Sequence, residues 1–260
     1  MAENGLGAEE SRAAFSKVPA VTLTFWVVKI FATTLGETAG DTVSMTFHAG
    51  YLLGTAIFLP LLVLLIAWQI RVRRFNAWLY WGTIIASTTA GTTLADFATR
   101  SLGIGYAGGS LLLFALVGAC LVAWRVTLGA LSVDTVSKPR EELFYWATIT
   151  ASQTLGTALG DWTADTGGLG YLGAATIFAG LLAVLAALHF GTRISRVVLF
   201  WSAFILTRPL GAAVGDFLDK PVDHGGLALS RPLASLLLAG AILLMLWWFP
   251  QRPGAHPVST

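Results

Sequence analysis

Acidic residues stand inside long apolar segments of this chain, where a charged side chain is costly unless it is paired or hydrated. Four are aspartates, Asp41, Asp96, Asp161 and Asp216, and Glu37 precedes the first of them by four residues. Residues four apart on a helix lie nearly one above the other, so Glu37 and Asp41 would share a helix face. Carboxylate oxygens are ligands for hard cations. The set therefore predicts an ion- or substrate-binding site.

Two basic residues, Lys29 and Arg208, occupy the same apolar segments. We expect them to balance the carboxylate charge or to act as gating groups. Lys29 lies eight residues before Glu37, which is about 12 Å along a helix axis. An ion pair of Lys29 would therefore reach across to another helix. A static buried ion pair between Lys29 and Glu37 is as good an interpretation as a gating pair.

Counting back in fours from each aspartate marks further polar positions on the same helix faces. Hydroxyl and amide groups there could line a hydrated site, or they could simply hydrogen-bond between helices. These positions are Thr33, Thr88, Thr92, Gln153 and Thr157.

The same carboxylates form the candidate metal set, with His48 as a further ligand because imidazole and carboxylate together suit manganese or zinc. In the simpler interpretation, the aspartates are polar groups at helix ends and His48 is an exposed loop residue. The metal candidates are Glu37, Asp41, Asp96, Asp161 and Asp216, with His48 in addition.

The elements that carry these residues are predicted to be transmembrane helices. The chain of 260 residues is 55% hydrophobic and only 12% charged, about half the charged fraction of a soluble domain. Apolar stretches of membrane-spanning length recur along it. The expected spans are 19–41, 50–70, 76–97, 105–125, 142–163, 169–190, 197–217 and 227–249.

Lysine and arginine are distributed unevenly between the two sides of these predicted spans. Eleven fall on the side of the chain ends, and two, Arg100 and Lys220, fall on the other side. The positive-inside rule then places both termini in the cytoplasm. Residues 1–18 and 250–260 are expected to be cytoplasmic tails, the first of them disordered, around a single transmembrane domain over 19–249.

A repeat with two spans occurs four times, over about 19–73, 74–128, 139–193 and 194–249. Each copy opens with an aromatic pair, places a glycine ten residues after its tryptophan and a small residue four further on, and then has the aspartate. All copies share one topology, so we expect an all-α fold with pseudo-fourfold or pseudo-twofold symmetry about the membrane normal. The aspartate-tipped faces should converge on the axis, surrounded by the more apolar helices. The repeat tryptophans are Trp26, Trp81, Trp146 and Trp201.

This pattern resembles the bacterial membrane family defined by domain of unknown function 347, which has four tandem two-helix repeats, each with a characteristic tryptophan. The resemblance covers about residues 19–249. It implies the fold, the repeat architecture and a bacterial inner-membrane location, and it implies no mechanism.

The favoured function is transport of a small cation, with a divalent metal such as Mn²⁺ ahead of monovalent ions. A proton-coupled transporter of a small anionic or zwitterionic solute stays open, as does a scaffold or sensor subunit that transports nothing. No nucleophile–base pair or metalloprotease motif points to an enzyme. We expect the lipid bilayer and a small ion or solute as partners, no nucleic acid, and no cofactor beyond a transported metal ion. A homo-oligomer stays open.

Overall fold

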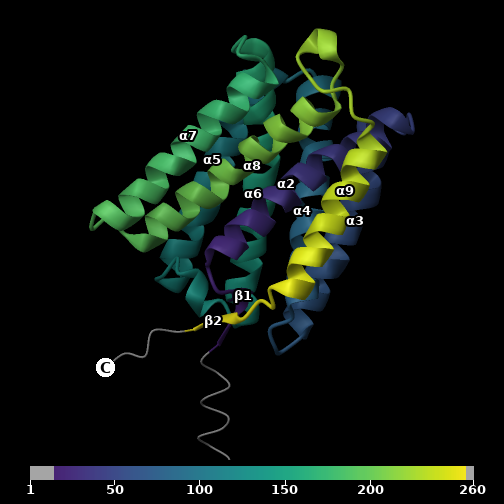
Figure 1. Ribbon diagram of the computed structural model, residues 1–260. Coiled ribbons are helices and arrows are strands. Elements are labelled where there is room, and N and C mark those ends of the chain that lie inside the picture. The colour runs from purple at the N-terminus through teal and green to yellow at the C-terminus, as the bar shows by residue number, and fades with distance from the viewer. Residues whose placement is uncertain (1–14, 256–260) are drawn as a thin grey trace, which may run out of the picture.

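A computed structural model describes residues 15–255, and within this range the chain forms long helices with a short strand at each end (Figure 1). Every predicted span coincides with one helix, to within four residues at either end. The elements are β1 (Phe15–Pro19), α2 (Leu23–Asp41), α3 (Gly50–Arg71), α4 (Ala77–Asp96), α5 (Gly105–Leu128), α6 (Pro139–Asp161), α7 (Gly170–Gly191), α8 (Arg196–Asp219), α9 (Arg231–Trp248) and β2 (Pro253–Ala255).

Local signals account for several helix boundaries. The side chains of Thr22 and Asn76 accept hydrogen bonds from backbone N–H groups in the first turns of α2 and α4. Pro139 occupies the first turn of α6, where its missing N–H has no helical partner to lose. Gly129 ends α5 in the left-handed conformation that glycine adopts without strain.

The first helices of the four repeats form a closed ring. Helix α2 packs against α4, α4 against α6, α6 against α8, and α8 back against α2. The second helix of each repeat packs mainly on the first helix of the following repeat, so α3 lies on α4, α5 on α6 and α7 on α8. Helix α9 closes the cycle on α2, beside which Figure 1 shows it. Each repeat therefore depends on its neighbours for burial.

Glycines allow the ring helices to approach closely. A Cβ atom on Gly36 would lie 2.2 Å from the side chain of Thr88 on the next helix. The same contact recurs around the ring, where Gly91 faces Gln153, Gly156 faces Arg208 and Gly211 faces Thr33. The glycine ten residues after each repeat tryptophan thus makes room for the residue at the equivalent position of the adjacent ring helix.

Gly156→Ala is expected to destabilise the protein, because its Cβ would lie 2.1 Å from the Arg208 side chain. Overpacking of this kind costs about 1–3 kcal/mol. The matched control is Gly180→Ala in α7, where a Cβ meets nothing within 4 Å and the exchange should be neutral or slightly stabilising. Unfolding midpoints of the two purified variants test this, and equal midpoints would contradict the close contact.

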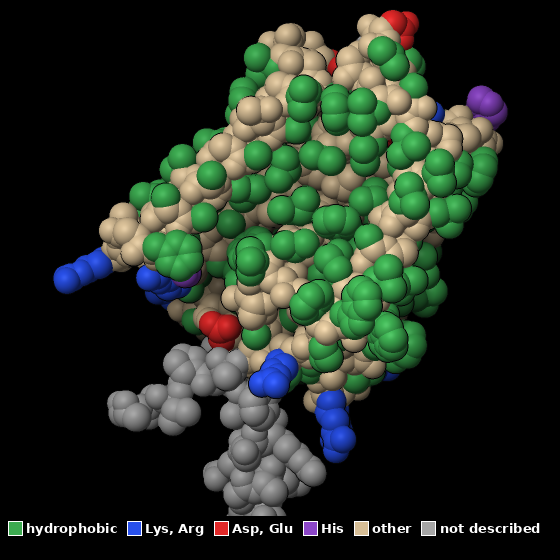
Figure 2. All heavy atoms as spheres, viewed as in Figure 1, with side chains coloured by type: hydrophobic (Ala, Val, Ile, Leu, Met, Phe, Trp, Pro, Cys, Tyr) green, Lys and Arg blue, Asp and Glu red, His purple; other side chains and the backbone are tan. Residues whose placement is uncertain are grey.

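The ring and the outer helices differ sharply in what they bury. The ring helices bury threonines, carboxylates and glycines, whereas α3, α5, α7 and α9 expose most of their apolar side chains. Figure 2 shows hydrophobic side chains covering the flank formed by α7, α8 and α9. In the described range, five helices (α3, α5, α7, α8 and α9) are long and apolar enough to cross a membrane. Helices α2, α4 and α6 are less apolar, because the polar residues that face the ring interior lower their mean hydropathy.

The two strands join the ends of the described chain. Strands β1 and β2 pair antiparallel, and Lys17 of β1 donates to the carbonyl of Gln69 and forms a 2.5 Å ion pair with Glu142. The expected disordered tail over 1–18 is therefore wrong for Phe15–Val18, which form part of β1, while residues 1–14 and 256–260 lie outside the described range. Lys and Arg side chains gather near this end of the molecule, here called the strand end (Figure 2).

Candidate functional site

The interior of the ring is built in levels one helical turn apart. The four aspartates form the outermost level, at the end of the ring opposite the strands, here called the aspartate end. One turn inward lie Glu37, Thr92, Thr157 and Ala212; the next level holds Thr33, Thr88, Gln153 and Arg208; the third holds Lys29, Ile84, Ile149 and Phe204. Every one of these side chains is buried. The sequence-predicted polar positions thus do converge inside one ring.

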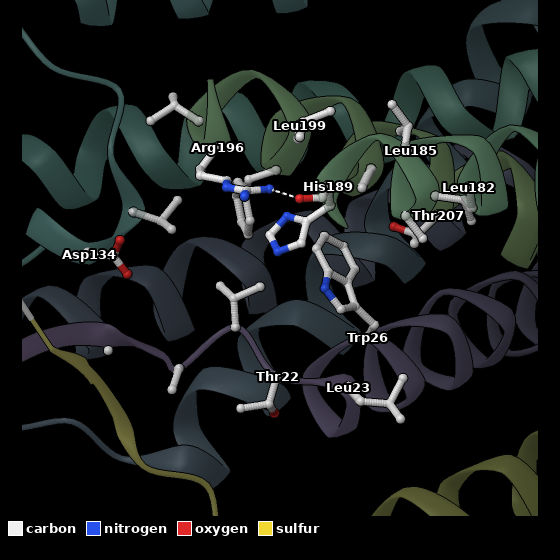
Figure 3. Close-up of a pocket in the computed structure, with 18 of the residues that line it drawn as sticks. Thr22, Leu23, Trp26, Asp134, Leu182, Leu185, His189, Arg196, Leu199 and Thr207 are labelled. Carbon is white, nitrogen blue, oxygen red and sulfur yellow. Dashed lines mark hydrogen bonds between the residues drawn. The ribbon is translucent and has the colours of Figure 1, made fainter. Parts of the chain in front are cut away.

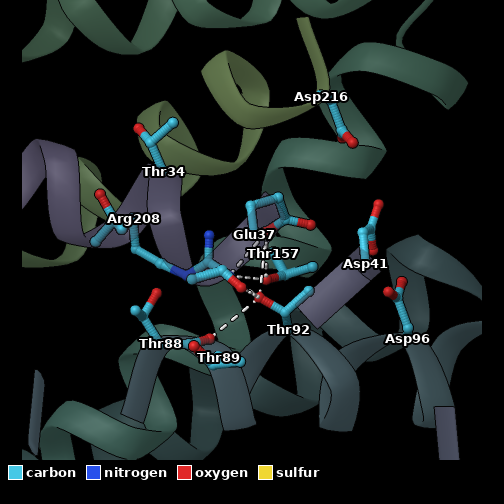
Figure 4. A network of polar contacts seen from close by, with 12 residues as sticks. Thr34, Glu37, Asp41, Thr88, Thr89, Thr92, Asp96, Thr157, Arg208 and Asp216 are labelled. Atoms are coloured by element: carbon cyan, nitrogen blue, oxygen red, sulfur yellow. Dashed lines mark hydrogen bonds and ion pairs between the residues drawn. The ribbon is translucent and has the colours of Figure 1, made fainter. Parts of the chain in front are cut away.

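A buried ion pair between Glu37 and Arg208 lies at the centre of the ring (Figure 4). Arg208 Nη2 donates to Glu37 Oε2 at 2.8 Å and to the hydroxyls of Thr92 at 2.6 Å and Thr157 at 2.5 Å. Both threonines also contact Glu37 Oε2, at 3.4 and 3.3 Å. Four helices therefore contribute to one network, and Glu37 pairs with Arg208 rather than with Lys29.

The sequence explains why Arg208 can reach this network. The residue one turn outward on its own helix is Ala212, whose small side chain leaves space where the other three repeats carry Glu37, Thr92 and Thr157. Gly156 on α6 accommodates the stem of Arg208. The guanidinium extends outward into that space and meets the three polar side chains.

Two basic residues bridge the aspartates in alternate gaps of the ring. Arg100 pairs with Asp96 at 2.8 Å and with Asp161 at 3.1 Å. Lys220 pairs with Asp216 at 2.9 Å and with Asp41 at 3.1 Å. Sequence analysis placed Arg100 and Lys220 only in loops. The signal that could have found them is their spacing, because each follows the aspartate of its repeat by four residues.

Lys220 remains protonated in this position. Burial lowers its pKa, but the charges of Asp216 and Asp41 outweigh that effect and hold the pKa well above its ordinary value. Its ammonium group therefore acts as a permanent cation tethered between two carboxylates.

Arg231, at the start of α9, adds a further cation to the same region. Its Nε lies 3.3 Å from Asp219 and 3.7 Å from Asp41. Asp219 is a buried carboxylate that follows Asp216 by three residues, and the sequence analysis did not select it as a site residue. The outer helix α9 thereby completes the charge network around Asp41.

Three of the candidate metal ligands come together. Glu37, Asp41 and Asp216 each offer an oxygen within 4.8 Å of the other two, and all three are buried. Asp96 and Asp161 lie outside this group and are held by Arg100. His48 is exposed and also lies outside it. The candidate metal set of six residues thus reduces to three that could share one ion.

Lys29 is fully buried beneath the central ion pair. Its Nζ lies 4.0 Å from the centre of the Phe204 ring and donates weakly to the hydroxyl of Thr207 at 3.4 Å. It has no carboxylate within ion-pair distance among the described residues. A counter-ion role towards Glu37 therefore falls to Arg208 alone.

Aromatic side chains fill the ring between Lys29 and the strand end. Phe25, Tyr80, Tyr145 and Phe200 occupy equivalent positions of the four ring helices and are buried. The hydroxyls of Tyr80 and Tyr145 lie 2.5 Å apart. Three repeat tryptophans are buried in the same cluster, and Trp26 is partly buried against it. These tryptophans thus pack in the core instead of anchoring at a lipid interface.

A separate groove with a volume of about 640 Å³ lies beside the aromatic level, between α2, α7 and α8 (Figure 3). Its walls are mainly apolar, with His189, Arg196 and Thr207 among its few polar side chains. Arg196 donates a hydrogen bond to the carbonyl of His189. None of the ring carboxylates lines this groove, so it is distinct from the predicted ion site.

Comparison with known proteins gives one finding. The sequence profile of a repeat of unknown function, DUF347, matches the chain four times, over residues 24–75, 79–129, 144–195 and 199–253. The four matches correspond to the four two-helix units of the structure. No curated protein and no solved structure matches the chain.

Proposed function

The chain belongs to the DUF347 repeat family, and on that premise we propose that it is a membrane transporter of a small cation, with a divalent metal as the preferred substrate. The observation that carries the proposal is the convergence of Glu37, Asp41 and Asp216, whose oxygens lie within 4.8 Å of one another inside the ring. Three carboxylates from two helices form a ligand set of the hard oxygen type.

The formal charge of the aspartate end supports a divalent ion. Its buried carboxylates outnumber its basic side chains by two when all are in their ordinary ionised forms. The carboxylates are Asp41, Asp96, Asp161, Asp216 and Asp219, and the basic side chains are Arg100, Lys220 and Arg231. A buried excess of two negative charges is costly in free energy. One bound divalent cation would neutralise that excess.

In this proposal all eight helices cross the membrane. The apolar outer helices shield the polar ring from lipid. Helices α2, α4 and α6 can therefore cross the membrane although their ring-facing residues are polar. The basic strand end faces the cytoplasm, by the positive-inside rule, and the aspartate end faces outward. The recurring contacts between the ring helices suit a pseudo-fourfold arrangement. Because Arg100 and Lys220 fill only alternate gaps between the four aspartates, the charged residues follow a pseudo-twofold arrangement.

Lys220 gives the site a simple exchange mechanism. Its ammonium group lies between Asp41 and Asp216, where a transported cation would bind. An incoming cation would displace Lys220, and the lysine would return when the ion leaves. The carboxylates are then never left without a positive partner.

The alternatives predict different ligands. In a transporter of an anionic solute, Arg208 would be a substrate ligand through the guanidinium atoms that Glu37 and the two threonines leave free, and the carboxylates would carry protons. A scaffold or sensor subunit would not require the carboxylates at all.

The test is a flux assay in proteoliposomes over a panel of metal ions and protons. Wild type should transport at least one cation, and Asp216→Asn should reduce that flux by about tenfold or more, since it removes one of three ligands. Asp165→Asn is the matched control, because Asp165 is an exposed aspartate close to the same end. No cation flux above empty liposomes would overturn the proposal.

A further inference from the structure

The level of the ring beneath Glu37 carries more positive than negative charge. Arg208 and Lys29 are both completely buried, and Glu37 is the only carboxylate among the described residues that pairs with either of them. Lys29 is thus left without a carboxylate partner in the interior of the ring, where an isolated charge would be strongly disfavoured.

Hydrogen-bonding groups at this level also lack partners. Arg208 Nε and Nη1, both amide atoms of Gln153 and the hydroxyl of Thr88 make no hydrogen bond within the described part of the chain, although all are buried. Figure 4 shows Thr88 below the guanidinium of Arg208. Buried polar atoms normally have protein or water partners. Buried polar groups from three helices therefore lack partners here, and the donors among them include Arg208 Nε and Nη1 and the Gln153 amide nitrogen.

We propose that the ring holds a small inorganic anion, of the size of chloride or nitrate, between the level of Arg208 and Gln153 and the level of Lys29. The anion accepts hydrogen bonds from Arg208 Nη1 and the Gln153 amide, and its charge offsets that of Lys29. The anion contacts no carboxylate of the proposed cation site, although Arg208 links the two sites by pairing with Glu37. A transported cation and the anion would occupy adjacent levels of one axis and attract each other.

The surroundings restrict the anion to a small one. Ile84, Ile149 and Phe204 form an apolar floor directly below, and the Glu37 network lies directly above. A carboxylate with an apolar body would have to displace one of these levels.

Chloride is the probe for the test. Purified wild type is kept in sodium gluconate, and chloride replaces gluconate at constant ionic strength and pH. The unfolding midpoint should rise saturably with chloride, and the ³⁵Cl resonance should broaden. Lys29→Met should weaken both responses by about tenfold or more. Arg193→Gln, which removes an exposed positive charge, should leave both unchanged.

Two further variants test the anion site if Lys29→Met does not fold and distinguish it from the cation site. If Lys29→Met does not fold, Gln153→Leu should weaken chloride binding by removing a donor without changing the charge. Glu37→Gln should preserve or tighten chloride binding while it weakens metal binding, which separates this site from the cation site. No saturable response in wild type would overturn the proposal, since Lys29 would then be neutral and the level would hold only water. An undiminished response in the folded Lys29→Met or Gln153→Leu variant would also overturn it.

Discussion

Arg208→Met destabilises the protein by about 3–5 kcal/mol, because it leaves the Glu37 carboxylate buried without its cation. The substitution also removes the donor that satisfies Thr92 and Thr157. The double variant Arg208→Met/Glu37→Gln should recover much of the loss, since no uncompensated charge then remains in the ring. Such recovery follows from the energetics of buried pairs, in which losing one partner is worse than losing both.

Unfolding in mixed micelles with increasing sodium dodecyl sulfate measures both variants against wild type. Arg125→Met serves as the control, because Arg125 is exposed on α5 and its loss should change stability by less than about 0.5 kcal/mol. A single variant as stable as wild type, or a double variant no better than the single one, would contradict a stabilising ion pair between Glu37 and Arg208.

Lys220→Met tightens divalent metal binding by about tenfold or more, because the tethered ammonium no longer competes for Asp41 and Asp216. Tenfold corresponds to about 1.4 kcal/mol, which lies near the lower end of the couplings measured for close charge pairs. The same variant should be less stable than wild type when metal is absent, since the two carboxylates then repel without a cation between them. Calorimetric titration with Mn²⁺ and unfolding midpoints with and without Mn²⁺ give both quantities.

Arg100→Met is the matched control for this prediction. Arg100 bridges the opposite gap of the ring, between Asp96 and Asp161, and neither of these belongs to the convergent carboxylate group. Its loss should destabilise the protein while changing metal affinity much less than the loss of Lys220. Equal effects of the two variants would argue against a site at Glu37, Asp41 and Asp216, and weaker binding by Lys220→Met would argue against displacement.

The register of the four repeats made most of the fold predictable. Equal spacing of the tryptophan, the glycine and the aspartate fixes equivalent positions on four helices, so the convergence of Glu37 with Asp41 and Asp216 could be expected from one ring. The eight apolar segments also predicted the helix positions closely, because apolar length is a local property of the chain.

The partners of the charged residues could not be predicted in the same way. Lys29 and Arg208 were both candidate counter-ions, and Glu37 binds Arg208, which lies 171 residues away. That pairing depends on Gly156 accommodating the arginine stem and on the short side chain of Ala212. Arg100 and Lys220 lie one helical turn beyond Asp96 and Asp216, where each also reaches the aspartate of a neighbouring repeat.

The sequence by itself determined the helices, their repeat and the level of each polar residue, because spacing along a helix sets its height and face. The tertiary structure decided the order of the ring, the pairing of each outer helix with the following repeat, and the charge partners. Those depend on which side chains meet across helices, and that is set by packing among residues far apart in the chain.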